Sequence, residues 1–140
     1  MTVPTEMPES LLDTDTLSLY RRSHPRVSAQ VAAYIRQYGQ LIFTELTRYE
    51  VLRGLMAAKA TRQLVGFEQL CRLHRILPFD EASARKSAEI WAELRARGQP
   101  IGEVDTMIAG AALAHELAVV SRNVVHFSRV PGLVVLDWTA

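Results

Sequence analysis

Short apolar runs that alternate with longer amphipathic segments constrain the fold of this chain more than any other feature of its sequence. Strand candidates built on short apolar runs occur at residues 11–13, 41–43, 76–77, 118–120 and 133–136, and each is separated from the next by segments with helical spacing. Strands that alternate with helices favour parallel pairing through right-handed crossovers, with helices on both faces of one sheet. We therefore expect an α/β protein, a three-layer α/β/α sandwich around a central, mostly parallel sheet.

Capping residues and apolar spacing place the helices between these strands. The first is expected at 14–22, the second runs from Pro25 to Gly39, the third follows the cap residue Thr44, and the fourth starts at Thr61. The third carries an apolar arc formed by Leu46, Tyr49, Leu52 and Met56. A fifth follows the cap residue Asp80, with Ala84, Ala88, Trp91 and Leu94 on one face, and ends at Gly98. A sixth, rich in alanine, is expected at 104–116.

The length of 140 residues suits one domain with one substantial core. Residues 1–9 are polar, contain two prolines and predict a flexible leader, so we expect a single domain over residues 10–140. The 16 basic and 15 acidic residues leave a net charge of +1, which argues neither for nor against a nucleic-acid partner.

The compartment is predicted from what the sequence lacks. Cys71 is the only cysteine, so an internal disulfide is excluded. The first nine residues lack the basic and apolar regions of a secretory signal. The longest apolar stretch, residues 107–120, is interrupted by His115 and Glu116 and is too short to span a bilayer. We expect a cytoplasmic protein without a membrane anchor.

Asp13 is the first residue to leave a buried apolar run, and it marks the expected position of a functional site. In open parallel sheets, ligands bind just outside the carboxyl ends of the strands. Asp105 is expected to reach the same edge, because it lies in the first turn of the alanine-rich helix on the same face as Ile108 and Ala112. Dipole stabilisation of a helix start is the alternative role for Asp105.

Glu50 is the third candidate acid. It lies four residues before Gly54, whose presence inside a helix predicts a close approach of another group to that face. Glu50 is favoured over Glu45, which sits at a helix start where acids are commonplace. Carboxylates gathered at one point repel one another, and the sequence places no Lys or Arg to neutralise them locally. A Mg²⁺ or Mn²⁺ ion, which prefers hard oxygen ligands, is therefore expected among them.

Ser121 and Asn123 follow the fourth strand and are expected at the same edge of the sheet. Ordinary turn formation is the alternative role for both. His126 is expected near this edge as a surface histidine. Cys71 and His74 form a C-x-x-H pair, which without a second pair makes a poor zinc site, so we assign Cys71 to packing and His74 to the surface.

Four segments in this order and spacing resemble the PIN-domain family, and within it the VapC-type toxins of bacterial toxin–antitoxin pairs. They are Leu11-Leu12-Asp13-Thr14-Asp15, Glu50-Val51-Leu52-Arg53-Gly54, Gly102-Glu103-Val104-Asp105-Thr106, and Ser121-Arg122-Asn123 with Phe127 and Val130-Pro131-Gly132. The resemblance covers nearly the whole chain from residue 10. The family's acids fall on Asp13, Glu50 and Asp105. Its fourth position falls on Asn123, where Asp is frequent, and His126 stands where many members have an acid.

The resemblance implies an endoribonuclease that depends on Mg²⁺ or Mn²⁺ and hydrolyses RNA phosphodiester bonds. Asp13, Glu50 and Asp105 would hold the metal, Asn123 would orient a water or phosphate, and Ser121 would support an acid by a hydrogen bond. Asp15 lies on the outgoing turn, and we expect it to brace that turn by hydrogen bonds. Arg21, Arg22, Arg53 and Arg122 are candidate RNA contacts, with solvated surface groups as the alternative. A VapB-type antitoxin, an RNA substrate with tRNA as one candidate, and a homodimer are the implied partners. The apolar helices of residues 45–73 are a candidate antitoxin surface, with ordinary core packing as the alternative.

Two other functions remain open from the sequence. One is a degenerate PIN-like module that binds RNA or protein without cleavage, and Asn123 and His126 are its main support. The other is a small metal-dependent phosphotransfer domain that would carry an acid-labile phosphate on Asp13.

Overall fold

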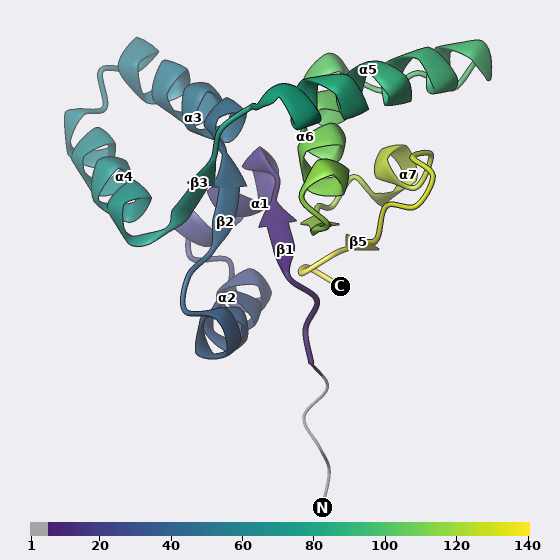
Figure 1. The fold of residues 1–140 in the computed structure, drawn as a ribbon. Helices are drawn as coiled ribbons and strands as arrows, with labels where there is room; N and C mark the ends of the chain where they lie inside the picture. The colour runs from purple at the N-terminus through teal and green to yellow at the C-terminus, as the bar shows by residue number, and fades with distance from the viewer. Residues whose placement is uncertain (1–5) are drawn as a thin grey trace, which may run out of the picture.

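The computed structural model describes residues 6–140 and contains a twisted sheet whose paired strands are all parallel (Figure 1). One ladder has the order β1–β4–β5, with Leu11 opposite Val119 and Val120 opposite Leu136. A second ladder pairs β2 with β3, and β2 lies beside β1. The strands are β1 (Ser10–Leu12), β2 (Ile42–Thr44), β3 (Arg75–Leu77), β4 (Ala118–Val120) and β5 (Val135–Leu136). The predicted mostly parallel sheet is confirmed.

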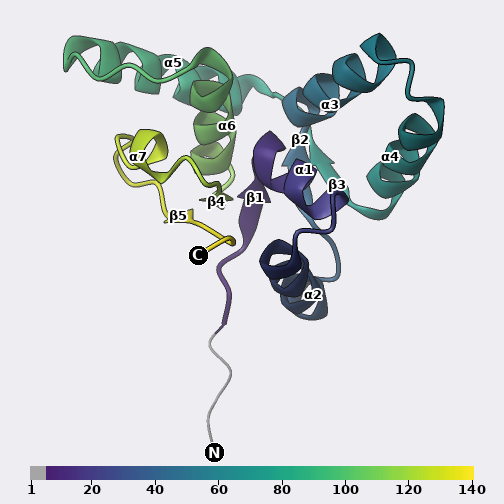
Figure 2. The same cartoon turned by 180° about the vertical axis from the view of Figure 1, so that it is seen from behind.

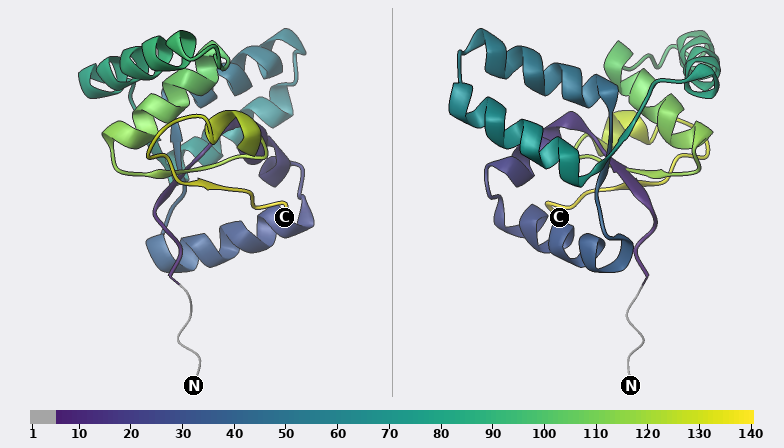
Figure 3. Two further views of the ribbon diagram at one scale, coloured as in Figure 1. Left: turned by 90° about the vertical axis from the view of Figure 1, so that its right-hand side faces the viewer. Right: turned by 60° about the vertical axis from the view of Figure 1, so that its left-hand side comes forward.

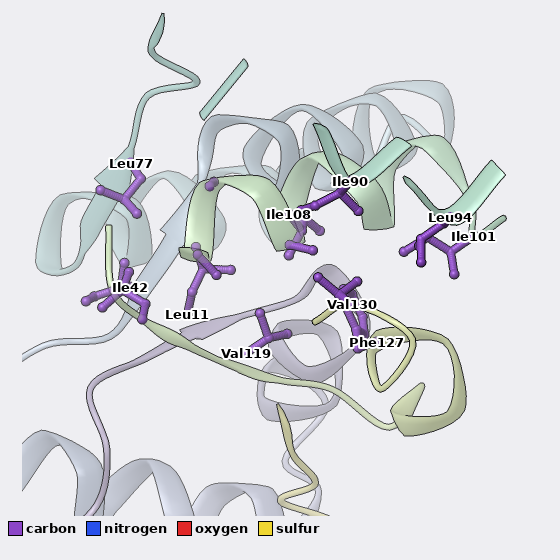
Figure 4. Close-up of a cluster of buried hydrophobic side chains, with 14 residues drawn as sticks. Leu11, Ile42, Leu77, Ile90, Leu94, Ile101, Ile108, Val119, Phe127 and Val130 are labelled. Atoms are coloured by element: carbon purple, nitrogen blue, oxygen red, sulfur yellow. The ribbon is translucent and has the colours of Figure 1, made fainter. Parts of the chain in front are cut away.

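Helices cover both faces of this sheet, as the two edge-on views in Figure 3 show. They are α1 (Thr14–Arg21), α2 (Pro25–Tyr38), α3 (Glu45–Ala57), α4 (Thr61–Leu73), α5 (Glu81–Ala96), α6 (Glu103–Ala114) and α7 (Val124–Phe127). Residues Leu11 and Val119 face α5, α6 and α7, where they join one hydrophobic cluster (Figure 4). Leu12 and Val120 point to the other face, where a second cluster joins them to α1, α2, α3 and α4. Side chains alternate along each strand, so two layers of helices form and the predicted α/β/α sandwich is confirmed.

The buried face of α5 differs from the predicted one. Ser83, Ser87, Ile90 and Leu94 point inward, while Trp91 is 41% exposed and Ala84 and Ala88 face solvent. The prediction followed the apolar side chains and was wrong for most of them, because the inner face is chosen by close packing against α6. A Cβ at Gly110 of α6 would lie 2.0 Å from Ser87 Oγ. Small residues at this contact therefore bring the two helices together.

The predicted apolar arc of α3 is divided between core and solvent: Leu46 and Leu52 are half-buried, and Leu52 packs against the second cluster. Tyr49 and Met56 are 60% and 56% exposed, whereas Thr47, Val51 and Leu55 form the buried face. The buried set includes a threonine, which a count of apolar residues leaves out. Gly54 meets no neighbouring atom where its Cβ would lie. The close approach predicted at Gly54 is therefore wrong, and Gly110 is the helical glycine that serves one.

The segment before β1 is held against α2. Met7 N donates to Gln37 Oε1 at 3.0 Å, and Gln37 Nε2 donates to Met7 O at 3.1 Å. Residues 1–5, the larger part of the predicted leader, lie outside the described residues. Over residues 6–140, every helix is too short or too polar to cross a membrane.

Candidate active site

Asp13 stands at the junction of β1, β4 and α1. Its backbone N–H donates to Val120 O at 3.1 Å, which continues the β1–β4 ladder by one residue. Its carboxylate accepts from Thr16 N at 2.8 Å and so caps the N-terminus of α1. The residue is only 6% exposed. Strand pairing on one side and helix capping on the other therefore fix the position of this carboxylate.

Asp105 is held from the end of β4. Asn123, just beyond that strand, donates from Nδ2 to Asp105 Oδ2 at 3.1 Å. The same nitrogen lies 2.9 Å from Nδ1 of His126 in α7. Ser121 is fully buried, and its hydroxyl accepts from Asn123 N at 2.8 Å. Ser121 thus shapes the turn that aims the Asn123 amide at Asp105.

Glu50 reaches the same region from α3 through a chain of hydroxyl groups. Thr14 Oγ1 donates to Glu50 Oε1 at 2.6 Å and lies 3.0 Å from Thr47 Oγ1. Arg53 Nη2 lies 3.7 Å from Glu50 Oε2 on the solvent side. Glu45 instead pairs with Arg48 on the surface. The structure thus places Glu50, and not Glu45, beside the residue that follows Asp13.

These side chains share one cavity of about 760 Å³ at the carboxyl ends of β1 and β4, which we call the carboxylate cavity. Carboxylates, hydroxyl groups and two arginines line most of it, with two apolar residues from α6. The lining residues are Asp13, Thr14, Asp15, Ser18, Arg22, Glu50, Val104, Asp105, Ile108, Arg122 and Asn123. The location matches the edge of a parallel sheet where ligands bind.

Two of the acids are held in surroundings that disfavour their charge. Burial raises the pKa of the Asp13 carboxyl, against hydrogen bonds from Ser121 and Thr16 that lower it. Burial also raises the pKa of Asp105, with a further contribution from the charge of Glu50, while the Asn123 amide lowers it. A cation bound near both carboxylates would favour their ionised forms.

Arginine compensates the other two acids, contrary to the prediction that no cation stands nearby. Asp15 accepts from Arg122 Nε at 2.7 Å and from Nη2 at 3.0 Å, a bidentate pair that ties α1 to the turn after β4. Glu50 has Arg53 at its outer oxygen. That prediction concerned Asp13, Glu50 and Asp105, and it is wrong for Glu50, because Arg53 lies only three positions after it in sequence.

The candidate RNA-contacting arginines are placed differently from one another. Arg22 and Arg122 line the carboxylate cavity. Arg53 does not line it but pairs with Glu50, which does. Arg21 turns away and lies over the ring of Phe67 in α4, 5.2 Å from its centroid. Three of the four predicted contacts therefore lie at or beside this cavity, and Arg21 does not line it.

Two residues have roles that the sequence did not reveal. Thr14, the residue after Asp13, holds Glu50 by a hydrogen bond. In the sequence, only its position directly after Asp13 pointed to a role in the site. His74 is half-buried and accepts from Leu41 N at 3.0 Å, so its assignment to the surface is wrong. Burial lowers the pKa of His74. Cys71 is buried, as predicted.

The donor set suits a hard cation bound by few protein ligands. In the part of the chain that the structure describes, no three Asp, Glu, His or Cys side chains converge closely enough to enclose an ion. Mg²⁺ commonly keeps several waters and is bound through one or two carboxylates. Asp13 and Asp105, both lining the cavity, fit that mode of binding, and Glu50 lines the same cavity.

Comparison with known proteins agrees with this geometry. Residues 10–133 match the PIN domain. A tRNA(fMet)-specific endonuclease VapC from Salmonella typhimurium is 30% identical over 129 residues, which span 91% of this chain and 96% of the relative. A protein of the same description from Shigella flexneri is 33% identical over 102 residues, spanning 72% of this chain and 77% of the relative.

Solved structures show the same fold. The crystal structure of DNA-bound VapBC from Salmonella typhimurium contains a chain that superposes with a TM-score of 0.83 at 27% identity, covering 94% of this chain and 99% of that one. FitAcB from Neisseria gonorrhoeae gives a TM-score of 0.80 at 28% identity, covering 92% and 97%. The sequence matches and the structural superpositions both extend over nearly the whole chain. The chain therefore belongs to the PIN-domain family, in its VapC-type group.

Proposed function

We propose that this chain is an endoribonuclease that requires Mg²⁺ or Mn²⁺ and acts as the toxin of a toxin–antitoxin pair. The observation that carries the proposal is the carboxylate cavity, where Asp13, Glu50 and Asp105 arrive from three separate elements of the fold. The relatives named as tRNA(fMet)-specific endonucleases support RNA cleavage, with tRNA as the first substrate to test.

Asp13 and Asp105 would hold the cation, with Glu50 acting through a bound water. When bound, the metal lowers the pKa of a water and stabilises negative charge on the phosphoryl oxygens. Side chains of this protein position the acids and the reacting groups. The Thr14 hydroxyl fixes one oxygen of Glu50. The Asn123 side-chain nitrogen is bonded to Asp105 and His126, so its amide oxygen would accept a hydrogen bond from an attacking water and orient it.

Arginine at the mouth of the cavity would bind the RNA backbone. Arg22 lines the cavity and has no carboxylate partner among residues 6–140. Arg122 is already paired with Asp15, so its proposed role is to hold the edge of the cavity in shape and not to bind RNA. Arg22 is therefore the first candidate for a phosphate contact.

A VapB-type antitoxin is the proposed protein partner. Such a partner would cover the apolar side chains exposed on two helices: Tyr49 and Met56 on α3, and Val65 and Leu73 on α4. Related toxins are found in VapBC structures. A homodimer is proposed on the same family resemblance.

A module that binds RNA without cleaving it is the second candidate. Asn123 supplies an amide where an acid is frequent in the family, and its contact with His126 keeps it engaged. The chain's membership in the PIN-domain family argues against the phosphotransfer domain.

The decisive experiment is Mn²⁺-dependent cleavage of purified bulk tRNA by antitoxin-free protein. We expect wild-type protein to cleave and Asp13→Asn to lose cleavage without losing its fold, because asparagine caps a helix as well as aspartate does. Asp80→Asn is the matched control: Asp80 caps α5 in the same way, accepting from Ser83 N at 2.9 Å, and lies outside the cavity. Cleavage by Asp13→Asn, or full activity in EDTA, contradicts the proposal. Absence of cleavage by wild-type protein supports the binding module.

A further inference from the structure

A second hollow of about 520 Å³ lies beside the carboxylate cavity, between α1 and α4. We call it the α1–α4 hollow, and the two helices can be followed in Figure 2. Its lining residues are Arg21, Arg22, Gln63, Gly66, Phe67 and Leu70. Arg22 lines both spaces, so a ligand that leaves the carboxylate cavity past Arg22 enters the hollow directly.

The chemistry of the hollow is opposite to that of the cavity. Its lining contains two arginines and no acid. Over residues 6–140, neither Arg21 nor Arg22 has a carboxylate within salt-bridge distance. Both arginines keep their charge at neutral pH. A ligand that fits must therefore bring negative charge to the junction at Arg22.

The guanidinium of Arg21, which lines the hollow, lies over an aromatic ring. Phe67 is 1% exposed, and the Arg21 guanidinium carbon lies 5.2 Å from its ring centroid. A guanidinium backed by an aromatic ring presents its other face to a planar group. The side chain of Gln63 offers both a donor and an acceptor at the exposed side.

We propose that the α1–α4 hollow binds the nucleotide next to the scissile phosphate of a single-stranded RNA, an inference that rests on the proposed function. Arg22 binds the phosphate that joins this nucleotide to the one in the carboxylate cavity. The base stacks on Arg21, and Gln63 contacts its edge. The hollow thus contributes to the choice of cleavage site.

Continuity with the cavity favours RNA over a protein ligand. A polyanion whose phosphates recur along the chain places charge at Arg22 whichever base follows, and a planar base matches the Arg21–Phe67 stack. The exposed apolar side chains proposed above for a protein partner do not line the hollow; they are Tyr49 and Met56 on α3 and Val65 and Leu73 on α4.

The test measures binding of a fluorescein-labelled single-stranded RNA heptamer of mixed sequence by anisotropy. All proteins carry Asp13→Asn, so that the probe stays intact. We expect Arg21→Gln to weaken binding by about tenfold, as for loss of one stacked base. Arg22→Gln should lower the slope of log K against log salt by about 0.7, the value for one phosphate on a single strand. Arg36→Gln is the control, because Arg36 is exposed at the far end of α2 and lines neither space.

Gly66→Leu separates loss of the site from loss of the fold. A Cβ at Gly66 meets no atom within 4 Å, and leucine is the better helix former, so α4 is not destabilised while the hollow is filled. We expect weaker RNA binding with an unchanged salt slope. Gly54→Leu is the matched control, since Gly54 is also helical and open but lines neither space.

Each outcome decides between the proposals. RNA binding unaffected by both Arg21→Gln and Gly66→Leu overturns the nucleotide site. The same result with weakened binding of the cognate antitoxin assigns the hollow to the protein partner instead. Failure of wild-type protein to cleave tRNA removes the nuclease proposal alone, because reduced heptamer binding by these variants would still establish the subsite.

Discussion

Replacement of Gly110 by alanine tests the packing that positions α6 and, with it, Asp105. A Cβ at residue 110 would lie 2.0 Å from Ser87 Oγ, 2.7 Å from Ser87 N and 2.8 Å from Ser87 Cα. The hydroxyl can rotate away, but the two backbone atoms belong to α5 and move only with that helix. Gly110→Ala must therefore separate α5 from α6 locally.

The magnitude follows from two opposing contributions. Alanine in place of glycine favours a helix by about 1 kcal/mol. Overpacking a core contact costs about 1–3 kcal/mol, and contact with backbone belongs at the upper end of that range. The net loss is then about 2 kcal/mol, which corresponds to a fall in melting temperature of roughly 6–8 °C for a domain of this size.

Differential scanning fluorimetry and urea unfolding measure this loss. Gly54→Ala and Gly66→Ala are matched controls: both glycines are helical with open space at the Cβ position, so both variants should be more stable by about 0.5–1 kcal/mol. If Gly110→Ala proves as stable as these controls, the close contact between α5 and α6 is not a constraint and the argument fails. The proposed nuclease activity should also fall in this variant, because α6 carries Asp105.

Three further predictions concern titration and metal binding. His74 accepts a backbone hydrogen bond and burial lowers its pKa, so stability should fall as pH drops below about 6.5; His74→Gln should flatten this dependence in urea unfolding. Asn123→Asp should lower the stability of metal-free protein by about 1 kcal/mol, because Asp105 loses a donor and gains a like charge, and Mn²⁺ should then raise the melting temperature more than in wild type. Mn²⁺ should stabilise Asp15→Asn but not Asp13→Asn, and equal shifts in both variants would contradict the assignment of the metal ligands.

The sheet and most element boundaries could be predicted because local signals coincide with them. Asp13, Thr44 and Asp80 each accept the backbone hydrogen bond that starts a helix, and Gly39 ends α2 with a φ of 85°. Short apolar runs then have the length of strands. Each of these signals involves residues only a few positions apart in the chain, so it can be recognised from the sequence alone.

The faces of the helices were harder to predict, because tertiary contacts choose them. The inner face of α5 carries Ser83 and Ser87, which a search for apolar residues rejects. Their small size is what lets Gly110 approach, and that approach depends on α6, more than 20 residues later. The short helix α7 was not predicted either, since four residues give too little periodicity to recognise.

The electrostatics of the site explain why a search for acids alone could not rank them. Four carboxylates line the cavity, yet Arg122 neutralises Asp15 and Arg53 stands beside Glu50. Among the described residues, Asp13 and Asp105 lack such a partner, and burial raises the pKa of both. The uncompensated charge therefore lies between β1 and α6, away from the two arginine-paired acids. A divalent cation bound there would replace the missing partner for both carboxylates at once, and we therefore propose these two acids as its direct ligands.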